Sequence, residues 1–172
     1  MKRFLWGFVF ALVLVVGAIL VYFGMGYAPV ATGAPPMPFE RLLAHAALHA
    51  KISKQPLAQP PIPADAANLT AGAQIYREHC SVCHGLPGRQ ETAIAKGMFP
   101  EPPQLLRGQG VTDDPPGETY WKASNGIRLS GMPGFQKSLS DTQLWQVSLM
   151  LANANKLPPA ATAVVSQPPP AK

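Results

Sequence analysis

The chain has 172 residues, among them 20 prolines and 15 glycines, and a formal net charge of +5. This length favours one compact domain with appended segments over two separate cores. The positive charge does not form a basic face for nucleic acid, because the stretch from Asp65 to Ala160 has eight basic and eight acidic residues. We therefore expect no nucleic-acid partner.

The N-terminal segment is apolar, since residues 4–23 contain no charge and no proline. At about 1.5 Å per residue, a helix of this length can cross a hydrocarbon core of roughly 30 Å. Lys2 and Arg3 precede it, and positively charged residues favour the cytoplasmic side. We expect residues 1–26 to form a cytoplasmic tip and a single transmembrane anchor. The alternative is a cleaved signal peptide, whose apolar region is usually about 7–15 residues long.

Residues 27–67 are rich in proline and alanine and are expected to form a connector with one short helix, Phe39 to Ile52. His45 and His49 lie four positions apart on that helix and could bind a metal ion, although surface histidines are the more ordinary interpretation. The prolines that follow predict a stiff, extended spacer. At the other end of the chain, residues 159–172 predict a disordered tail.

Residues 68–158 are expected to form the compact, all-α domain. Three helices are predicted, at about residues 70–83, at about residues 116–124, and after a capping box formed by Ser140 and Gln143. Between the first two lies the segment from Gly85 to Pro115, which is rich in proline and has no clear period. A segment of this length is unusual in a compact domain unless it wraps something large and apolar.

Both cysteines of the chain lie in the sequence Cys80-Ser81-Val82-Cys83-His84. Positions three apart at a helix end lie on one side, so both thiols can reach two vinyl groups on one haem edge. The next residue is turned by about 100° around the helix axis, which lets His84 place a ring nitrogen on the iron. The C-x-x-C-H pattern is typical of covalent c-type haem (heme c) attachment, and one such haem is expected.

This motif has three other interpretations. A thioredoxin-like dithiol needs a βαβ context, and the chain has no convincing strand pattern. A structural zinc site needs four ligands, usually from a second paired motif, and none follows. A disulfide between residues three apart would be strained. Covalent haem attachment is therefore the prediction.

The sixth iron ligand has three candidates, Met98, Met132 and Met150. Met150 falls in the third predicted helix, where methionine is commonly core filler. Met98 follows the motif closely, which leaves little chain to reach the other face of the haem. Met132 lies further along, and the neighbouring glycines allow the backbone to approach the ring. We expect Met132 to be the ligand, with Arg128 and Trp121 as candidate contacts to the haem propionates or the crevice.

With these residues in place, the stretch from Asn68 to Pro158 resembles the class I monohaem cytochromes c, in particular the membrane-anchored bacterial type. The resemblance rests on Gly72 and Tyr76 ahead of the C-x-x-C-H motif and on the Gly131-Met132-Pro133 loop. It implies that the first and last helices cross at a contact between glycine and aromatic residues. It also implies that the Pro103 carbonyl accepts a hydrogen bond from His84.

The expected function is the transfer of single electrons between redox protein partners, not catalysis, because protein ligands would fill both axial positions. The expected location is the bacterial cytoplasmic membrane, with one span and the cytochrome domain in the periplasm. Two alternatives stay open. One is a haem relay subunit of a larger oxidoreductase, and the other is a gas-binding haem protein with a labile methionine.

Overall fold

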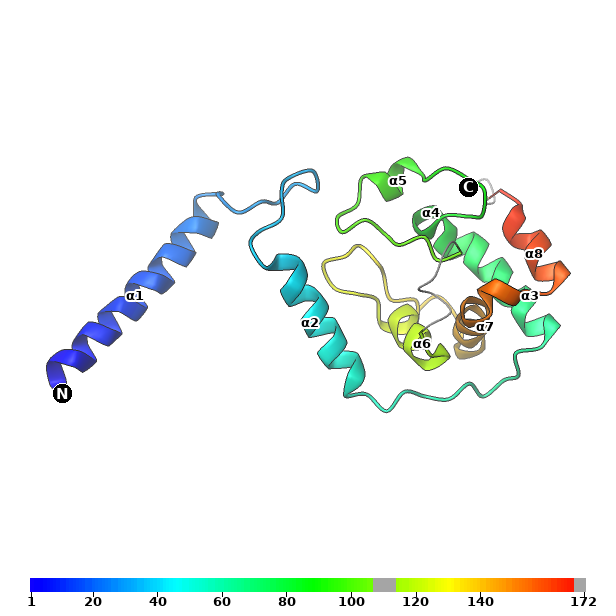
Figure 1. The fold of residues 1–172 in the computed structure, drawn as a ribbon, viewed down its shortest axis with the longest axis horizontal. Helices are drawn as coiled ribbons and strands as arrows, with labels where there is room; N and C mark the ends of the chain where they lie inside the picture. The colour runs from blue at the N-terminus through cyan, green and yellow to red at the C-terminus, as the bar shows by residue number, and fades with distance from the viewer. Residues whose placement is uncertain (107–113, 169–172) are drawn as a thin grey trace. The chain divides into compact units, whose positions relative to one another are not determined.

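The computed structural model describes residues 1–106 and 114–168. Secondary structure in these residues is helical apart from one isolated bridge between Ile127 and Met132, so the expected all-α fold is confirmed. The chain divides into two units, Met1–His45 and Ala46–Lys172 (Figure 1).

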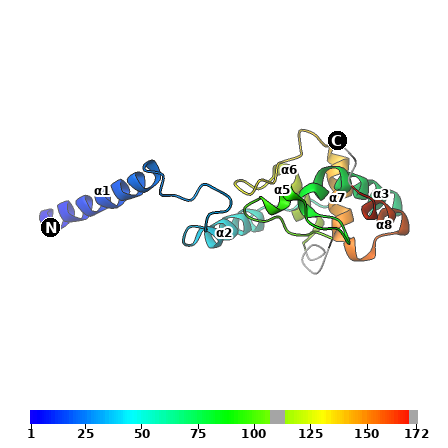
Figure 2. The same ribbon diagram turned by 90° about the horizontal axis from the view of Figure 1, so that it is seen from above.

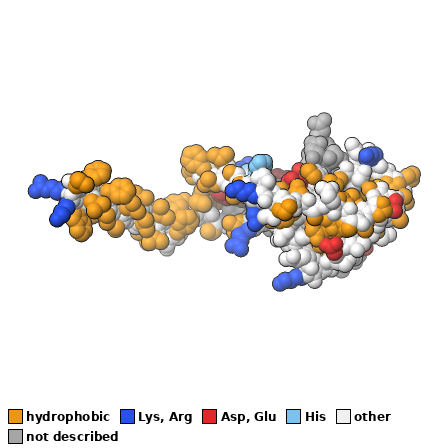
Figure 3. All heavy atoms as spheres, turned by 90° about the horizontal axis from the view of Figure 1, so that it is seen from below, with side chains coloured by type: hydrophobic (Ala, Val, Ile, Leu, Met, Phe, Trp, Pro, Cys, Tyr) orange, Lys and Arg blue, Asp and Glu red, His pale blue; other side chains and the backbone are white. Residues whose placement is uncertain are grey.

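Helix α1 (Lys2–Gly24) has no buried residue. Its length and composition allow it to cross a membrane, although a signal sequence near an N-terminus has the same properties. Hydrophobic side chains run along this helix, and Lys and Arg lie at its tip (Figure 3). The helix therefore fits the expected membrane anchor.

Helix α2 (Glu40–Ser53) corresponds to the helix predicted in the connector. The segment after it is extended, but part of it packs on the compact domain. Ile62 lies against the hydrophobic core, and Gly117 approaches Leu57 and Ala58 so closely that a Cβ would collide with the Ala58 carbonyl oxygen. The expected spacer is therefore extended but is not a free linker.

After the extended segment comes a continuous helical run of three pieces. Helix α3 (Ala66–Ile75) begins after Asp65, whose carboxylate caps the Asn68 N–H at 2.9 Å. A π-helical turn, η1 (Tyr76–Cys80), follows, and α4 (Ser81–His84) completes the run. The sequence predicted the run but not the widened turn.

Three further helices follow this run along the chain. The short α5 (Ala93–Lys96) lies in the segment where no helix was predicted. Helix α6 (Pro116–Asn125) has proline at its start and ends at Gly126, which has a φ of 69°. Helix α7 (Asp141–Ala152) starts at the predicted capping box of Ser140 and Gln143.

Helices α3 and α7 cross at Gly72. A Cβ there would lie 2.8 Å from the Cβ of Met150 and closer still to the Gln146 carbonyl oxygen. Only glycine allows this approach. The crossing buries Tyr76, Ser148 and Met150 almost completely. Met150 is thus part of the core, as its position in the helix predicted.

The expectation of a disordered tail is wrong for residues that form α8 (Pro159–Ser166), which follows a 3-10 turn, η2 (Ala154–Lys156). Ala161 and Val165 lie four residues apart on one face of α8 and are buried in the core. Figures 1 and 2 both show α8 beside α3. The proline-rich composition hid this apolar pair. Residues 169–172 of the expected tail lie outside the described residues.

Candidate haem site

The C-x-x-C-H motif lies where the helical run ends. In the widened turn the Ser81 N–H donates to the Tyr76 carbonyl, five residues back, a π-type bond that often occurs at functional sites. Cys80 and Cys83 are half-buried free thiols. Burial raises the pKa of Cys80 to about 12, and the neighbouring Cys83 contributes to this increase.

His84 is oriented by a backbone oxygen from the following loop. Its Nδ1 lies 2.8 Å from the Pro103 carbonyl oxygen. A carbonyl can only accept, so Nδ1 carries the proton and Nε2 retains a free lone pair. Burial lowers the pKa of His84, and the bond to Pro103 only partly opposes this effect. The imidazole is therefore neutral at neutral pH, the form that binds metals.

Several other hydrogen bonds fix the end of this helical run. The Tyr76 hydroxyl lies 3.1 Å from the His84 carbonyl oxygen and 2.9 Å from that of Gly85. Thr92 donates from its hydroxyl to the Val82 carbonyl at 2.6 Å, which ties the loop after the motif back to α4. Burial strongly raises the pKa of Tyr76, so its hydroxyl stays protonated and can donate.

The Met132 loop closes on itself. The Ile127 N–H donates to the Met132 carbonyl at 3.1 Å, and a Cβ on Gly126 would lie only 2.5 Å from the Gly134 nitrogen. Gly131 has a φ of 77°, and a Cβ there would lie 2.6 Å from the terminal methyl carbon of Met98. Met98 and the Met132 loop are therefore neighbours, a contact that sequence reasoning missed because no local pattern links them.

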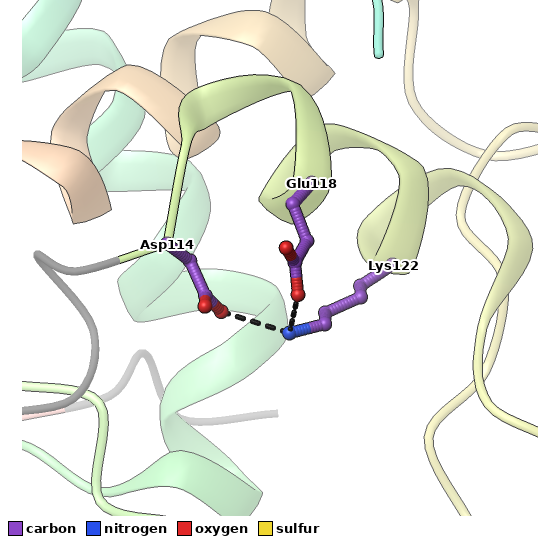
Figure 4. A network of polar contacts seen from close by, with 3 residues as sticks. All are labelled: Asp114, Glu118 and Lys122. Carbon is purple, nitrogen blue, oxygen red and sulfur yellow. Dashed lines mark hydrogen bonds and ion pairs between the residues drawn. The ribbon is translucent and has the colours of Figure 1, made fainter. Parts of the chain in front are cut away.

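The residues in and after α6 that could contact a haem differ in their exposure and in their ion pairs. Lys122 bonds to Asp114 at 2.8 Å and to Glu118 at 2.7 Å (Figure 4). Burial lowers the pKa of Lys122, but these two carboxylates outweigh it and raise the pKa overall. Trp121 is half-buried, whereas Arg128 in the following loop is exposed.

Two aromatic residues join α6 to α7. Tyr120 stacks on Trp145 with ring centroids 4.2 Å apart, and its hydroxyl donates to Asp141. That hydrogen bond is the main cause of the raised pKa of Tyr120. This stacking joins the two helices on either side of the Met132 loop.

His45 and His49 both lie on α2, and no further metal-binding side chain joins them there. No group of three or more His, Cys, Asp or Glu side chains that could hold a metal ion occurs among residues 1–106 and 114–168. The two histidines are both exposed.

The chemistry of the motif fits a covalent haem. Two thiols that form no disulfide lie on one helical turn. Beside them is the neutral imidazole of His84, whose Nδ1 is hydrogen-bonded to the Pro103 carbonyl. A zinc site would need further thiol or imidazole ligands, and the described residues supply none nearby.

The helical fold and this motif define a c-type cytochrome domain. Residues 67–149 match the sequence family described as cytochrome c oxidase, cbb3-type, subunit III. This segment is therefore a cytochrome c domain of that type, which implies a covalent haem c and electron transfer. The match confirms the resemblance to cytochromes c that the sequence suggested.

No curated protein matches the chain. Among solved structures, a chain of a reducing HAO-like protein complex from Kuenenia stuttgartiensis is similar, with a TM-score of 0.49 and 24% identity. The similarity covers 58% of this chain and 49% of the solved one, so it spans about half of that chain's length.

Proposed function

We propose that this protein is a membrane-anchored electron carrier that works at the outer face of the cytoplasmic membrane. Cys80 and Cys83 attach one haem, and Nε2 of His84 binds its iron. The observation that carries this proposal is the 2.8 Å contact between Nδ1 of His84 and the Pro103 carbonyl, which leaves Nε2 as the free nitrogen of a neutral ring. A bound haem supplies a one-electron iron couple.

We assign the sixth ligand to Met132. Its loop is closed by short backbone contacts and carries glycine at positions where a side chain would collide. A thioether opposite an imidazole favours reduced iron and a comparatively high reduction potential. Arg128 and Trp121 supply candidate donors for the propionates, while Lys122 is already bonded to two carboxylates.

The anchor supports this role because it keeps the carrier next to membrane-bound redox partners. With α1 retained, the domain is held at the exported side of the membrane. If both axial ligands come from the protein, substrates have no open position on the iron. The protein then transfers electrons without chemistry at the metal.

A second candidate function is a haem relay subunit within a larger oxidoreductase. The observation that favours it is the description of the matching family, which names an oxidase subunit. Purification from membranes in mild detergent distinguishes these two candidate functions. A relay subunit would co-purify with stoichiometric partner chains, whereas a mobile carrier would elute alone.

Carbon monoxide tests the carrier against the gas-binding alternative. The reduced full-length protein is mixed with carbon monoxide, and the haem absorption spectrum is recorded over time. A carrier with both axial positions filled should bind the gas slowly and incompletely. Rapid, complete binding would mean an open or weakly held sixth position, and a sensor or enzyme would replace the carrier as the best account.

A further inference from the structure

Helix α2 has apolar side chains on two opposite sides. Leu48 is half-buried and Ile52 is buried. At about 100° per residue, Leu42 and Leu43 lie about 120° and 140° around the helix from Leu48, and Phe39 directly precedes the helix. Phe39, Leu42 and Leu43 are 71%, 65% and 65% exposed. We call these three residues the outer apolar face of α2.

Phe39 at the start of this face has an unusual backbone. Its φ is 63°, in the left-handed region that bulky residues rarely adopt. The preceding turn holds this conformation, because the Glu40 carboxylate accepts a hydrogen bond from the Met37 N–H at 2.7 Å. Strain of this kind persists where the protein benefits from the resulting geometry. The Phe39 side chain is exposed in this conformation.

The connection to α1 limits what this face can meet. Residues 25–39 separate α1 from α2. Even fully extended, this segment reaches about 50 Å, at roughly 3.3–3.6 Å per residue. An exposed aromatic and two leucines within this reach of a membrane span match the composition of helices that lie in the lipid interface.

The charges near α2 complement a lipid surface. Lys51 and Lys54 are exposed at its C-terminal end. Long lysine side chains can lie along the helix and extend their amines towards lipid headgroups. The compact stretch from Asp65 to Ala160 has no net charge, so attraction to an anionic surface comes from this region rather than from the cytochrome domain.

We propose that α2 lies on the outer surface of the membrane, with its outer apolar face in the headgroup region and Lys51 and Lys54 over anionic lipids. The proposal rests on retention of α1, which is part of the proposed function. It gives α2 a second attachment to the membrane, which restricts the cytochrome domain to partners near the lipid surface.

Site-directed spin labelling of the full-length haem protein tests this placement. One nitroxide is attached through Leu43→Cys on the outer apolar face, or through Ala44→Cys, the matched control on the adjacent side. Each protein is reconstituted into vesicles of phosphatidylethanolamine and phosphatidylglycerol. Collisions with oxygen, which concentrates in lipid, are compared with collisions with a water-soluble nickel chelate.

The Leu43 label should show a several-fold higher ratio of oxygen to nickel collisions than the Ala44 label. Equal, water-like ratios would overturn the proposal. Spin–spin broadening at Leu43 without the higher ratio would also overturn it and would assign the face to a second copy of the chain. The ratio should fall in vesicles of phosphatidylcholine alone, and an unchanged ratio would overturn the assignment of an anionic surface.

Two controls separate this proposal from the proposed function. The unmutated protein should take up no label, because both of its cysteines are bound to haem. Labelling there would contradict haem attachment rather than the placement of α2. Mass spectrometry of the purified chain shows whether α1 is retained, so a cleaved anchor is recognised independently of the collision ratios.

Discussion

The two segments proposed to bind the haem iron, one around His84 and one around Met132, are held in different ways. On the His84 side, hydrogen bonds reach the motif from three separate parts of the chain: Tyr76 in η1, Thr92 before α5, and Pro103 in the following loop. On the Met132 side, most bonds lie within the loop, between Ile127 and Met132 and around Ser130, and the Phe135 N–H bonds to the Ala123 carbonyl of α6 at 2.9 Å. The His84 side is thus held by segments up to 19 residues away along the chain, and the Met132 side mainly by its own loop.

This difference indicates where the function of the site is decided. A ligand held by several separate segments stays in place as long as those segments keep their positions. A ligand held by a local loop can be released by a small local opening, which costs less than global unfolding. If Met132 is the sixth ligand, the stability of its loop decides whether the protein is a carrier or binds gas.

The largest effect should come from removing both thiols. In Cys80→Ser/Cys83→Ser, no covalent haem should remain, because the serine hydroxyls cannot form thioether bonds. Denaturing electrophoresis followed by a peroxidase stain for haem measures this, since thioether bonds survive unfolding. A stained band of the double variant would contradict the assignment of the motif.

The next largest effect should come from the Met132 side. Met132→Ala should remove the far-red band that sulfur ligation gives oxidised haem, open the iron to carbon monoxide and lower the reduction potential. Covalent haem should remain. Absorption spectra and redox titration measure these changes.

Met98→Ala is the matched control for Met132. The Met98 methyl carbon contacts Gly131, so its removal should loosen the packing beneath the loop. The far-red band should nevertheless persist. Loss of the band in Met98→Ala with retention in Met132→Ala would reverse the assignment of the ligand.

Most helices and the motif could be predicted from the sequence, because their signals are local. The capping box at Ser140 and the apolar run of α1 are contained in a few residues. Contacts between segments that are distant in the sequence leave no local pattern, and the proximity of Met98 to Gly131 is an example. The buried pair Ala161 and Val165 was hidden in a proline-rich segment, where composition outweighed a helical spacing of four. The Pro103 contact was expected only from the resemblance, not from local sequence.

A moderate effect should come from the buried hydroxyl on the His84 side. Tyr76→Phe removes the hydrogen bonds to the His84 and Gly85 carbonyl oxygens inside the core. Loss of a buried hydrogen bond costs about 1–3 kcal/mol when its partner is left unpaired. We expect the free energy of global unfolding to fall by this amount in urea denaturation, while haem attachment is unchanged. An unchanged unfolding midpoint would show that the contacts to Tyr76 do not stabilise this side.

The smallest global effect should come from the corresponding hydroxyl on the Met132 side. Ser130 donates to the Ile127 carbonyl at 2.7 Å and accepts from the Met132 N–H at 3.3 Å. Ser130→Ala removes both bonds, but the loop is partly exposed and water can replace them. The free energy of global unfolding should therefore fall by only about 0.5–1 kcal/mol.

The far-red band should disappear at a lower urea concentration than the one that unfolds the domain, because only the loop has been weakened. Ser130→Thr, which retains the hydroxyl, should keep the two transitions closer together. If Ser130→Ala instead lowered global stability as much as Tyr76→Phe, with the band lost only on unfolding, the Met132 loop would be as firmly tied to the fold as the His84 side.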